Sequence, residues 1–443
     1  MRYDLGPTWK PTRISNFFAL SAALALAGCG GESGSSEVVA VVDAPPVSTG
    51  GAPASGSSGS GAQAPTPAPA PAPSPAPTPA PTSDAATDAV PGIAGVKQLG
   101  SIASNFDVSR WLEPSWGSGA LASTGRPDVV GAFRFICTPS HNSYDDPIVY
   151  PGQRGRAHLH TFFGNTGANA DSTYQSLRTS GESTCNNLLN RSAYWVPAMM
   201  TAEGRVVMPD YFQIYYKRRP ASDPACQTIA KACVDLPRGL RYVFGYDMAA
   251  MGNPAVAAHK MWFGCDGPGA TFTGNANIAQ AARGCPTGAK LGATLVAPDC
   301  WDGKNLDSPD HRSHMAYTHY DDGRERCPAT HPYLVPAFQL GAWYTTDDTL
   351  DRSGDESPDA RTWRFSSDRM PGMPAMTPGT SFHADWFGAW DDEVMRTWTD
   401  HCINKLLSCS GGDLGNGKQL KMFSGFKWAA NPRVVDAPAR PGA

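Results

Sequence analysis

Short hydrophobic runs separated by turn residues dominate the chain between residues 130 and 345. The runs are rich in Phe, Tyr, Trp and Val, and clusters of Gly, Pro, Asn and Asp separate them. Runs of this length and composition, bounded in this way, predict β-strands. We expect strands over 132–136, 158–163, 194–200, 212–217, 241–246, 260–263, 293–297, 315–320 and 334–340.

One segment near the C-terminal end has the spacing of a helix instead. Asp391 stands where it can cap a helix that extends to Leu407, and the apolar residues of this segment recur at helical spacing. No repeat and no linker interrupts residues 96–443. The pattern therefore predicts one large, mainly β domain with this single C-terminal helix. We expect a β-sandwich or jelly roll with long disulfide-pinned loops rather than a closed barrel.

The sequence before this domain has the pattern of an export signal and a tether. Residues 1–28 contain a basic start, an apolar core too short for a permanent membrane span, and small residues before Cys29. This pattern is typical of bacterial lipoproteins, so we expect a lipid on Cys29; the alternative is ordinary secretion with cleavage near Ala27. Residues 29–95 are rich in Gly, Ser, Ala and Pro, which predicts a disordered tether. We therefore expect the protein in the bacterial cell envelope, lipid-anchored at the outer membrane or cell surface.

The other ten of the eleven cysteines all lie beyond residue 130. An even number in an exported domain predicts five disulfide bonds. Spacing suggests the pairs Cys226–Cys233, Cys265–Cys285 and Cys402–Cys409, with Cys137–Cys185 and Cys300–Cys327 completing the set, although sequence alone does not fix the connectivity. A zinc-thiolate site is the alternative, and the lack of a Cys-x-x-Cys motif argues against it.

Charge and motifs exclude several classes of function. The formal net charge is −4 and both signs are mixed along the chain, so nothing indicates a nucleic-acid-binding surface. The sequence contains no nucleophile elbow, no phosphate-binding loop and no His-Glu-x-x-His motif. No apolar run of membrane-spanning length follows the signal. We expect a monomer.

Histidines carry the strongest chemical signal, because five of the ten lie in three short clusters. The first is the pair His158 and His160 in a predicted strand, where residues i and i+2 share a face. The two imidazoles can bind a metal, or supply a base and a hydrogen-bond donor; the alternative is one packed and one exposed histidine. Arg154 and Arg156 precede the pair and could hold an anionic group of a substrate.

The second cluster is a polar loop between Cys300 and Tyr317 that contains His311 and His314. Asp and Asn oxygens in this loop could bind calcium, and the residues concerned are Asp302, Asn305, Asp307 and Asp310. Alternatively, Asp310 and His314 would join His158 and His160 in a transition-metal site. The remaining alternative is a disulfide-pinned loop whose Asp side chains cap turns.

The third cluster is His383 and Asp385, where the carboxylate can orient the imidazole or both can ligate one ion. Trp386 and Trp390 follow at once, and with Trp301 they predict aromatic stacking on a sugar ring, although core packing is the commoner role of tryptophan. We expect the three clusters to converge in one centre, formed by His158, His160, His311, His314, His383 and Asp385.

The order of these motifs resembles the domain-of-unknown-function family nineteen-ninety-six over about residues 106–407. The resemblance rests on Asp146-Pro147-Ile148-Val149, on the run from His158 to Asn165, on the run from Cys300 to Met315, and on His383-Ala384-Asp385. Members of this family occur in fungi and bacteria and are typically secreted, and fungal members often carry cell-wall or carbohydrate-binding modules. The resemblance therefore implies contact with a polysaccharide and supplies neither a reaction nor catalytic residues.

Three hypotheses for function follow. The first is a surface-anchored extracellular carbohydrate-active enzyme, a polysaccharide hydrolase or lyase with a His/Asp centre. The second is a non-catalytic glycan-binding or adhesion module, and the third is a metal-binding surface protein. A polysaccharide or cell-envelope glycan is the expected partner, and a divalent metal such as calcium or zinc is the candidate cofactor.

Overall fold

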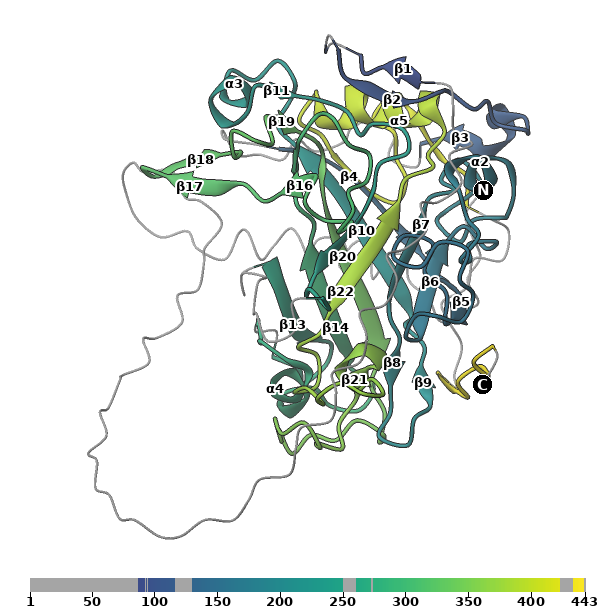
Figure 1. Cartoon of the computed structure of the whole chain (residues 1–443), viewed down its shortest axis with the longest axis vertical. Coiled ribbons are helices and arrows are strands. Elements are labelled where there is room, and N and C mark those ends of the chain that lie inside the picture. The colour runs from purple at the N-terminus through teal and green to yellow at the C-terminus, as the bar shows by residue number, and fades with distance from the viewer. Residues whose placement is uncertain are drawn as a thin grey trace, which may run out of the picture. The chain divides into compact units, whose positions relative to one another are not determined.

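Two β-sheets packed face to face form the centre of the fold (Figure 1). The computed structural model describes residues 87–91, 93, 95–115, 130–249, 260–271, 274–422 and 433–441. The chain divides into two units, residues 1–79 and 80–443, and every described residue belongs to the second. The predicted signal peptide, Cys29 and most of the predicted tether lie outside the described residues.

The larger sheet has six strands in the order β13-β14-β20-β10-β4-β23. All neighbours in it pair antiparallel except β23, which runs parallel to β4. Its strands are β13 (Met261–Asp266), β14 (Lys290–Val296), β20 (Ala337–Thr345), β10 (Tyr211–Arg218), β4 (Gly131–Cys137) and β23 (Ser408–Cys409).

The smaller sheet has five strands in the order β12-β22-β7-β6-β5, and all its neighbours pair antiparallel. Its strands are β12 (Arg241–Gly245), β22 (His383–Phe387), β7 (Ala193–Pro197), β6 (His160–Gly164) and β5 (Pro139–Ser143). This sheet carries the candidate site.

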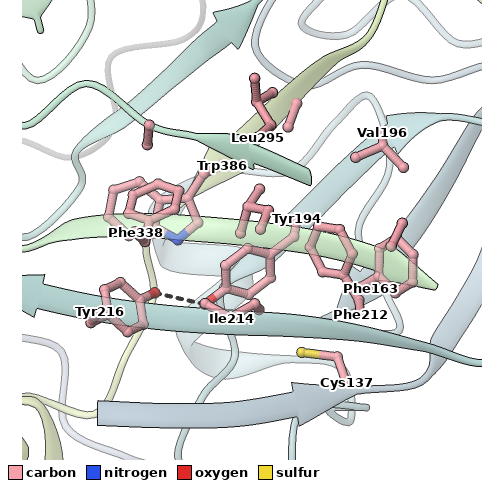
Figure 2. Packing of buried hydrophobic residues seen from close by; sticks show 14 of the residues in the cluster. Cys137, Phe163, Tyr194, Val196, Phe212, Ile214, Tyr216, Leu295, Phe338 and Trp386 are labelled. Atoms are coloured by element: carbon pink, nitrogen blue, oxygen red, sulfur yellow. Dashed lines mark hydrogen bonds between the residues drawn. The ribbon is translucent and has the colours of Figure 1, made fainter. Parts of the chain in front are cut away.

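Large apolar side chains from both sheets fill the space between them (Figure 2). Phe163 of β6 stacks on Phe212 of β10, with ring centroids 4.2 Å apart. The hydroxyl groups of Tyr194 on β7 and Tyr216 on β10 share a hydrogen bond of 2.8 Å across the interface. Because alternate residues of a strand point to opposite faces, the neighbours of these core residues point away from the sandwich.

The outer face of the five-stranded sheet has a second apolar layer. Phe162, Trp195 and Phe387 project from β6, β7 and β22 into this layer. Helix α2 (Tyr174–Thr179) and the loop that contains Ile148 pack over them. The loops therefore shield one part of this face from water, and the predicted histidines lie beside that shielded part.

Short elements complete the described part of the chain. The remaining strands are β1 (Thr87–Ala89), β2 (Lys97–Leu99), β3 (Leu112–Pro114), β8 (Met199–Met200), β9 (Val206–Val207), β11 (Ala232–Cys233), β15 (Cys300–Trp301), β16 (Met315–Ala316), β17 (His319–Asp321), β18 (Arg324–Arg326), β19 (Tyr333–Leu334), β21 (Arg364–Phe365), β24 (Lys418–Leu420) and β25 (Val434–Val435). The remaining helices are α3 (Ala225–Ile229), α4 (Ile278–Arg283) and α5 (Asp392–Trp398), with short turns at Val108–Trp111, Ser366–Asp368 and Thr399–Ile403.

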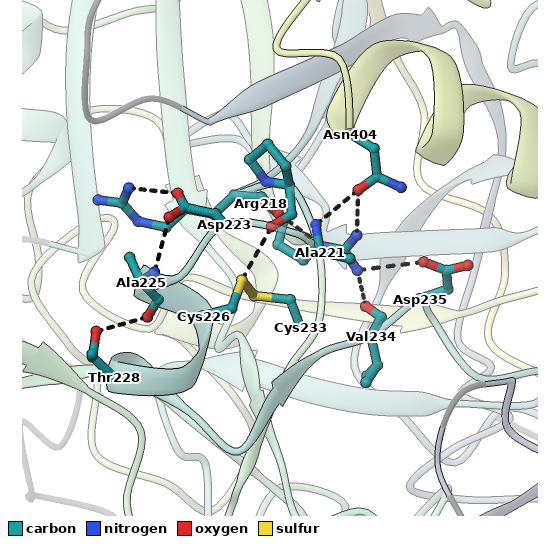
Figure 3. The surroundings of a disulfide bond; sticks show 12 residues. Arg218, Ala221, Asp223, Ala225, Cys226, Thr228, Cys233, Val234, Asp235 and Asn404 are labelled. Atoms are coloured by element: carbon teal, nitrogen blue, oxygen red, sulfur yellow. Dashed lines mark hydrogen bonds and ion pairs between the residues drawn. A yellow bond between two sulfur atoms is a disulfide. The ribbon is translucent and has the colours of Figure 1, made fainter.

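All five disulfide bonds form with the predicted partners: Cys137–Cys185, Cys226–Cys233, Cys265–Cys285, Cys300–Cys327 and Cys402–Cys409. Figure 3 shows the surroundings of one of them, Cys226–Cys233. The buried guanidinium of Arg218 donates to the Val234 carbonyl and to Asn404 Oδ1, the latter at 3.1 Å. The disulfide therefore closes a loop. At the base of this loop, the buried Arg218 links the chain to Asn404, which follows α5.

The predicted fold class is confirmed: strands dominate, and each predicted strand region contains a strand. The C-terminal helix begins with the Asp391 cap, as predicted, but it ends by residue 403 because Leu406 adopts a positive φ of 56°. Short helices α2, α3 and α4 were not predicted. Strand β1 (Thr87–Ala89), which lies within the residues predicted as tether, pairs with β2. No helix among the described residues is long and apolar enough to cross a membrane.

Candidate metal centre

Strand register brings His160, His383 and Asp385 onto one face of the five-stranded sheet. His160 on β6 pairs with Pro197 of the central strand β7, and Asp385 on β22 pairs with Trp195 of the same strand. Residues paired across a sheet point to the same face, and so do residues i and i+2 of one strand. All three side chains therefore project from the outer face, away from the sandwich core.

The three imidazoles come close together at the beginning of β6 and β22. The ring centroids of His158 and His160 are 4.1 Å apart, and those of His158 and His383 are 5.0 Å apart. Potential ligand atoms of His158, His160 and His383 all lie within 4.8 Å of one another. Atoms that share one tetrahedral zinc ion at about 2.0–2.1 Å lie about 3.3 Å apart, so the imidazoles are close to ligating distance.

Hydrogen bonds to the backbone fix the tautomer of two of these histidines. His160 Nδ1 lies 3.0 Å from the Asp145 carbonyl oxygen, and His383 Nδ1 lies 2.8 Å from that of Ser381. A carbonyl only accepts, so Nδ1 must carry the proton in each ring and Nε2 keeps its lone pair. Metal-binding histidines are commonly held in this way. His160 Nε2 is buried and has no hydrogen-bond partner, and the same holds for His158 Nε2.

Two carboxylates extend the cluster. Ligand atoms of Asp146, His160 and Asp385 form a second trio within 4.8 Å of one another. Asp385 is only 1% exposed, and neither of its carboxylate oxygens has a hydrogen-bond partner in the described part of the chain. Asp146 is also buried, but its Oδ1 accepts hydrogen bonds from the backbone N–H groups of Ile148 and Val149. A buried carboxylate without any partner is costly, and a bound cation would offset that cost.

The electrostatics of the cluster favour neutral imidazoles with free lone pairs. Burial lowers the pKa of His383 to about 3 and also lowers the pKa of His160. Burial, and next the neighbouring His160, lower the pKa of His158 well below its ordinary value. Burial raises the pKa of Asp385 well above its ordinary value, and the nearby Asp146 adds to this shift. A divalent cation would reverse the preference of Asp385 and favour its ionised form.

The donor set fits one transition-metal ion better than calcium. His160 belongs to both trios and has a single free lone pair, so it can ligate one ion, and members of either trio could share that ion with it. Imidazole nitrogen suits zinc, copper, iron and nickel, whereas calcium takes six to eight oxygen ligands. Of the two metals expected from the sequence, the cluster therefore fits zinc.

The histidines of the polar loop have other partners. His314 Nδ1 lies 2.8 Å from Ser308 Oγ, and its Nε2 lies 2.9 Å from the Arg241 carbonyl. His311 Nδ1 bonds Asp307 at 2.8 Å. Asp310 accepts from the backbone of Arg312 and Ser313, which makes it a turn cap. The structure does not place His311, His314 or Asp310 in the cluster, because local hydrogen bonds already use their polar atoms.

The loop's other oxygen atoms are also used locally. Asp302 accepts from the backbone of Lys304 and Asn305 and from the Asn305 side chain. Asp307 pairs with Arg241 at 2.9 Å. These contacts agree with the alternative of a disulfide-pinned loop whose Asp side chains cap turns.

The predicted aromatic wall does not form. Trp301, Trp386 and Trp390 are 0%, 1% and 3% exposed and belong to the sandwich core. Trp386 follows Asp385 on a strand, so the two side chains must face opposite sides of the sheet. These three tryptophans therefore offer no surface on which a sugar ring could stack.

The two predicted substrate arginines differ in their surroundings. Arg154 pairs with Asp171, with its Nε 2.8 Å from Oδ2. Arg156 is exposed and lies over the Tyr150 ring, 5.7 Å from the ring centroid. Of these two arginines, Arg154 has a carboxylate partner and Arg156 has none among the described residues.

Sequence reasoning missed two residues of the site. Asp146 stands in the Asp-Pro-Ile-Val run, yet a lone Asp before proline has the pattern of a turn cap, which it also is. Arg312 lies between His311 and His314, and its guanidinium donates to the Gly245 and Tyr246 carbonyls. Gly245 pairs with His383 across the sheet. Because Arg312 donates to the Gly245 carbonyl, it connects the polar loop to the strand that lies beside His383.

A family model described as Domain of unknown function (DUF1996) matches residues 146–390. The chain belongs to this family. The match covers more than half of the chain, starts at Asp146, and includes every residue of the cluster. The DUF1996 resemblance expected from the sequence motifs is thereby confirmed. No curated protein and no solved structure matches the chain.

Proposed function

We propose that this protein is a metal-dependent enzyme of the cell exterior. Its centre would bind one zinc-class ion through His158, His160, His383 and Asp385, with Asp146 as a further ligand or partner. The observation that carries the proposal is the buried Asp385 carboxylate, which has no hydrogen-bond partner among the described residues and has a ligand atom within 4.8 Å of one of His160.

Two features favour a catalytic over a structural ion. Structural zinc sites are closed and often rich in cysteine, but here all ten cysteines of the domain form disulfides. His158 is the member of the imidazole trio that is not fully buried, although its Nε2 atom is buried. An ion there would lower the pKa of a bound water, and the carboxylate oxygen of Asp385 that does not ligate the ion could accept a proton from that water.

The substrate class that we propose is a polysaccharide, and the reaction is its cleavage by hydrolysis or elimination. This choice rests on the cell-wall context that the family resemblance implies. A non-catalytic glycan-binding module is the other candidate, but the burial of Trp301, Trp386 and Trp390 removes the aromatic surface on which that idea relied. The location that we propose remains the bacterial cell envelope with a lipid on Cys29, and the five disulfides are compatible with it.

Metal analysis of the full chain tests the proposal. The purified protein, stripped by a chelator and then dialysed against zinc, cobalt or calcium, is expected to retain about one zinc or cobalt per chain and no stoichiometric calcium. Cobalt should give the visible absorption of a site of low coordination number. His160→Asn should lose the ion, whereas His319→Ala should keep it, because His319 is exposed on β17.

Activity is tested separately on a panel of glycans, by measuring new reducing ends or unsaturated products with and without the ion. Product that forms only in the metal-loaded sample supports the enzyme. Binding of a glycan without product would favour the binding module, and failure of the wild type to retain zinc or cobalt would overturn the centre itself.

A further inference from the structure

Three guanidinium groups on segments next to the metal centre have no carboxylate in hydrogen-bonding contact among the described residues. They belong to Arg156, Arg312 and Arg440, which come from three separate segments of the described chain. Arg156 and Arg440 form no ion pair with any described residue, and the nearest carboxylate to Arg312 is Asp247, whose Oδ1 lies 3.9 Å from Nε. By contrast, Arg154 and Arg241 nearby are each paired with an aspartate.

Arg440 borders the centre on the side of His158. Its Nη2 donates to the Ala157 carbonyl at 3.1 Å and its Nη1 to the Gly155 carbonyl at 3.4 Å, so the group contacts the backbone next to His158. The guanidinium also lies over the Tyr144 ring, 4.6 Å from its centroid. Arg156 lies on the same loop, two residues before His158. Arg440 has five N–H donors, and within the described residues two hydrogen bonds, to the Gly155 and Ala157 carbonyls, engage them.

Arg312 borders the centre on the side of His383. Its Nη1 donates to the Gly245 carbonyl at 3.2 Å and its Nη2 to the Tyr246 carbonyl at 2.8 Å. The loop that carries it is fastened to edge strand β12, because Val243 N–H donates to the His311 carbonyl at 2.9 Å. His311 has a positive φ of 57°, and this turn leads the chain to Arg312. The side chain is 22% exposed, so part of it is open to solvent.

The charges of the site become unbalanced once a divalent ion is bound. The ion would neutralise Asp146 and Asp385, the two carboxylates of the cluster. Asp247, whose Oδ1 lies 3.9 Å from Nε, would then be the carboxylate paired with Arg312, while Arg156 and Arg440 form no ion pair with any described residue. Guanidinium groups held by carbonyl groups and an aromatic ring keep their charge and are well placed to donate paired hydrogen bonds to an oxyanion.

We propose that the substrate is an acidic glycan, whose carboxylate or sulfate groups are bound by Arg312 on one side of the ion and by Arg440 and Arg156 on the other. This inference rests on the proposed metal-dependent function and names the class of polysaccharide that the centre accepts. Arg312 and Arg440 are positioning residues for that substrate, and a neutral glycan would leave their guanidinium groups without partners.

The binding experiment uses the full zinc-loaded chain and three polymers: polygalacturonate, which carries carboxylates, dextran sulfate, and neutral dextran. Polygalacturonate or dextran sulfate should bind, and the stronger of the two identifies the acidic group; dextran should not bind. Binding should weaken as salt is raised, because charge attraction contributes to it. Equal binding of neutral dextran, or binding of neither acidic polymer, would overturn the proposal.

Variants locate the binding to the proposed arginines. Arg312→Gln and Arg440→Gln should each weaken binding of the acidic polymer by about tenfold, since each removes a charge-assisted pair of hydrogen bonds. Arg110→Gln is the matched control, because Arg110 is 82% exposed and pairs with Asp107 on a distant turn. Wild-type affinity in both test variants would overturn the proposal. So would equally strong, arginine-dependent binding of single-stranded DNA, since this would make the site a general polyanion surface.

The zinc content of the same samples separates this inference from the proposed function. Zinc retained at the wild-type level with arginine-independent binding would refute the arginine sites and leave the metal centre intact. Zinc lost from the wild type while binding still depends on Arg312 and Arg440 would refute the metal centre and leave the arginine sites. Zinc retained together with arginine-dependent binding supports both.

Discussion

The most direct test of the metal centre concerns the free energy of unfolding and not activity. Asp385 lies on β22 with Trp195 and Val243 as its cross-strand neighbours, and its carboxyl group has no hydrogen-bond partner. Leaving a buried polar group unpartnered costs about 1–3 kcal/mol. Asp385→Val replaces this group by a β-branched side chain that suits a strand between apolar neighbours. In a chelator we therefore expect the variant to be more stable than the wild type by about 1–3 kcal/mol.

Zinc should cancel most of this advantage, and it should reverse the order of the two proteins where the advantage in chelator is below about 2.7 kcal/mol. At a thousandfold excess over its dissociation constant, an ion that binds only the folded state stabilises it by about 4 kcal/mol. If the loss of a carboxylate ligand weakens zinc binding about a hundredfold, it removes about 2.7 kcal/mol of that gain. The assay is urea unfolding of both proteins with disulfides intact, once in chelator and once in zinc.

Asp368 provides the matched control, because it is also 1% exposed but fully partnered. Its carboxylate accepts from the backbone N–H groups of Phe365, Gly379 and Ser381 and from the Ser381 hydroxyl. Asp368→Val leaves several buried N–H and O–H donors without an acceptor, so it should lower the free energy of unfolding by at least about 3 kcal/mol, both in chelator and in zinc. If Asp385→Val is as destabilising in chelator as Asp368→Val, the reasoning from an unpartnered carboxylate is refuted.

Three further predictions concern other parts of the chain. Burial raises the pKa of Asp299 to about 6, so the folded state binds the extra proton and loses stability as pH rises from about 4 to 6. Asp299→Asn should remove this pH dependence of the unfolding free energy, which is at most about 3 kcal/mol, in unfolding curves measured at several pH values. An unchanged pH dependence in the variant would contradict the prediction. Replacing both Cys137 and Cys185 by serine opens a loop with a sequence separation of 48 and should cost about 4 kcal/mol in urea unfolding, whereas a cost below about 1 kcal/mol would contradict the chain-entropy account. Cys29→Ser should move the protein from the membrane to the soluble fraction after cell fractionation, and a variant that stays with the membrane would rule out a lipid on Cys29.

The hydrophobic pattern predicted the scaffold well because burial between two sheets constrains it strongly. Strands such as β10 and β20 alternate large apolar residues with polar ones, and the cysteines pair with neighbours in the chain or across adjacent segments. The cluster of His158, His160, His383 and Asp385 was also predicted, since i and i+2 positions on strands must share a face. That two strands with this spacing lie on either side of β7 is a property of the sheet order and not of either motif.

The remaining errors have a common cause, which is that side chains near each other in sequence were assumed to act together. His311 and His314 lie in an Asp-rich turn that satisfies their rings locally, so a polar sequence there does not indicate a ligand site. Trp386 is adjacent to Asp385, and strand alternation places it on the core face. Arg440 contacts the site from a segment far along the chain, and no local pattern around it gives a signal.

Side chains along β22 alternate between the two faces of the sheet, and this limits which substitutions the strand can accept. His383 and Asp385 of the strand serve the candidate centre, whereas the even-numbered Ala384 and Trp386 fill the sandwich. Substitutions at positions 383 and 385 could therefore exchange one set of ligands for another without repacking the interior, which makes the outer face a natural starting point for redesign. Insertion or deletion of one residue within the strand would instead turn Trp386 outward and an ionisable group inward. Diversification at this strand should therefore proceed by replacement of side chains, while its length stays fixed.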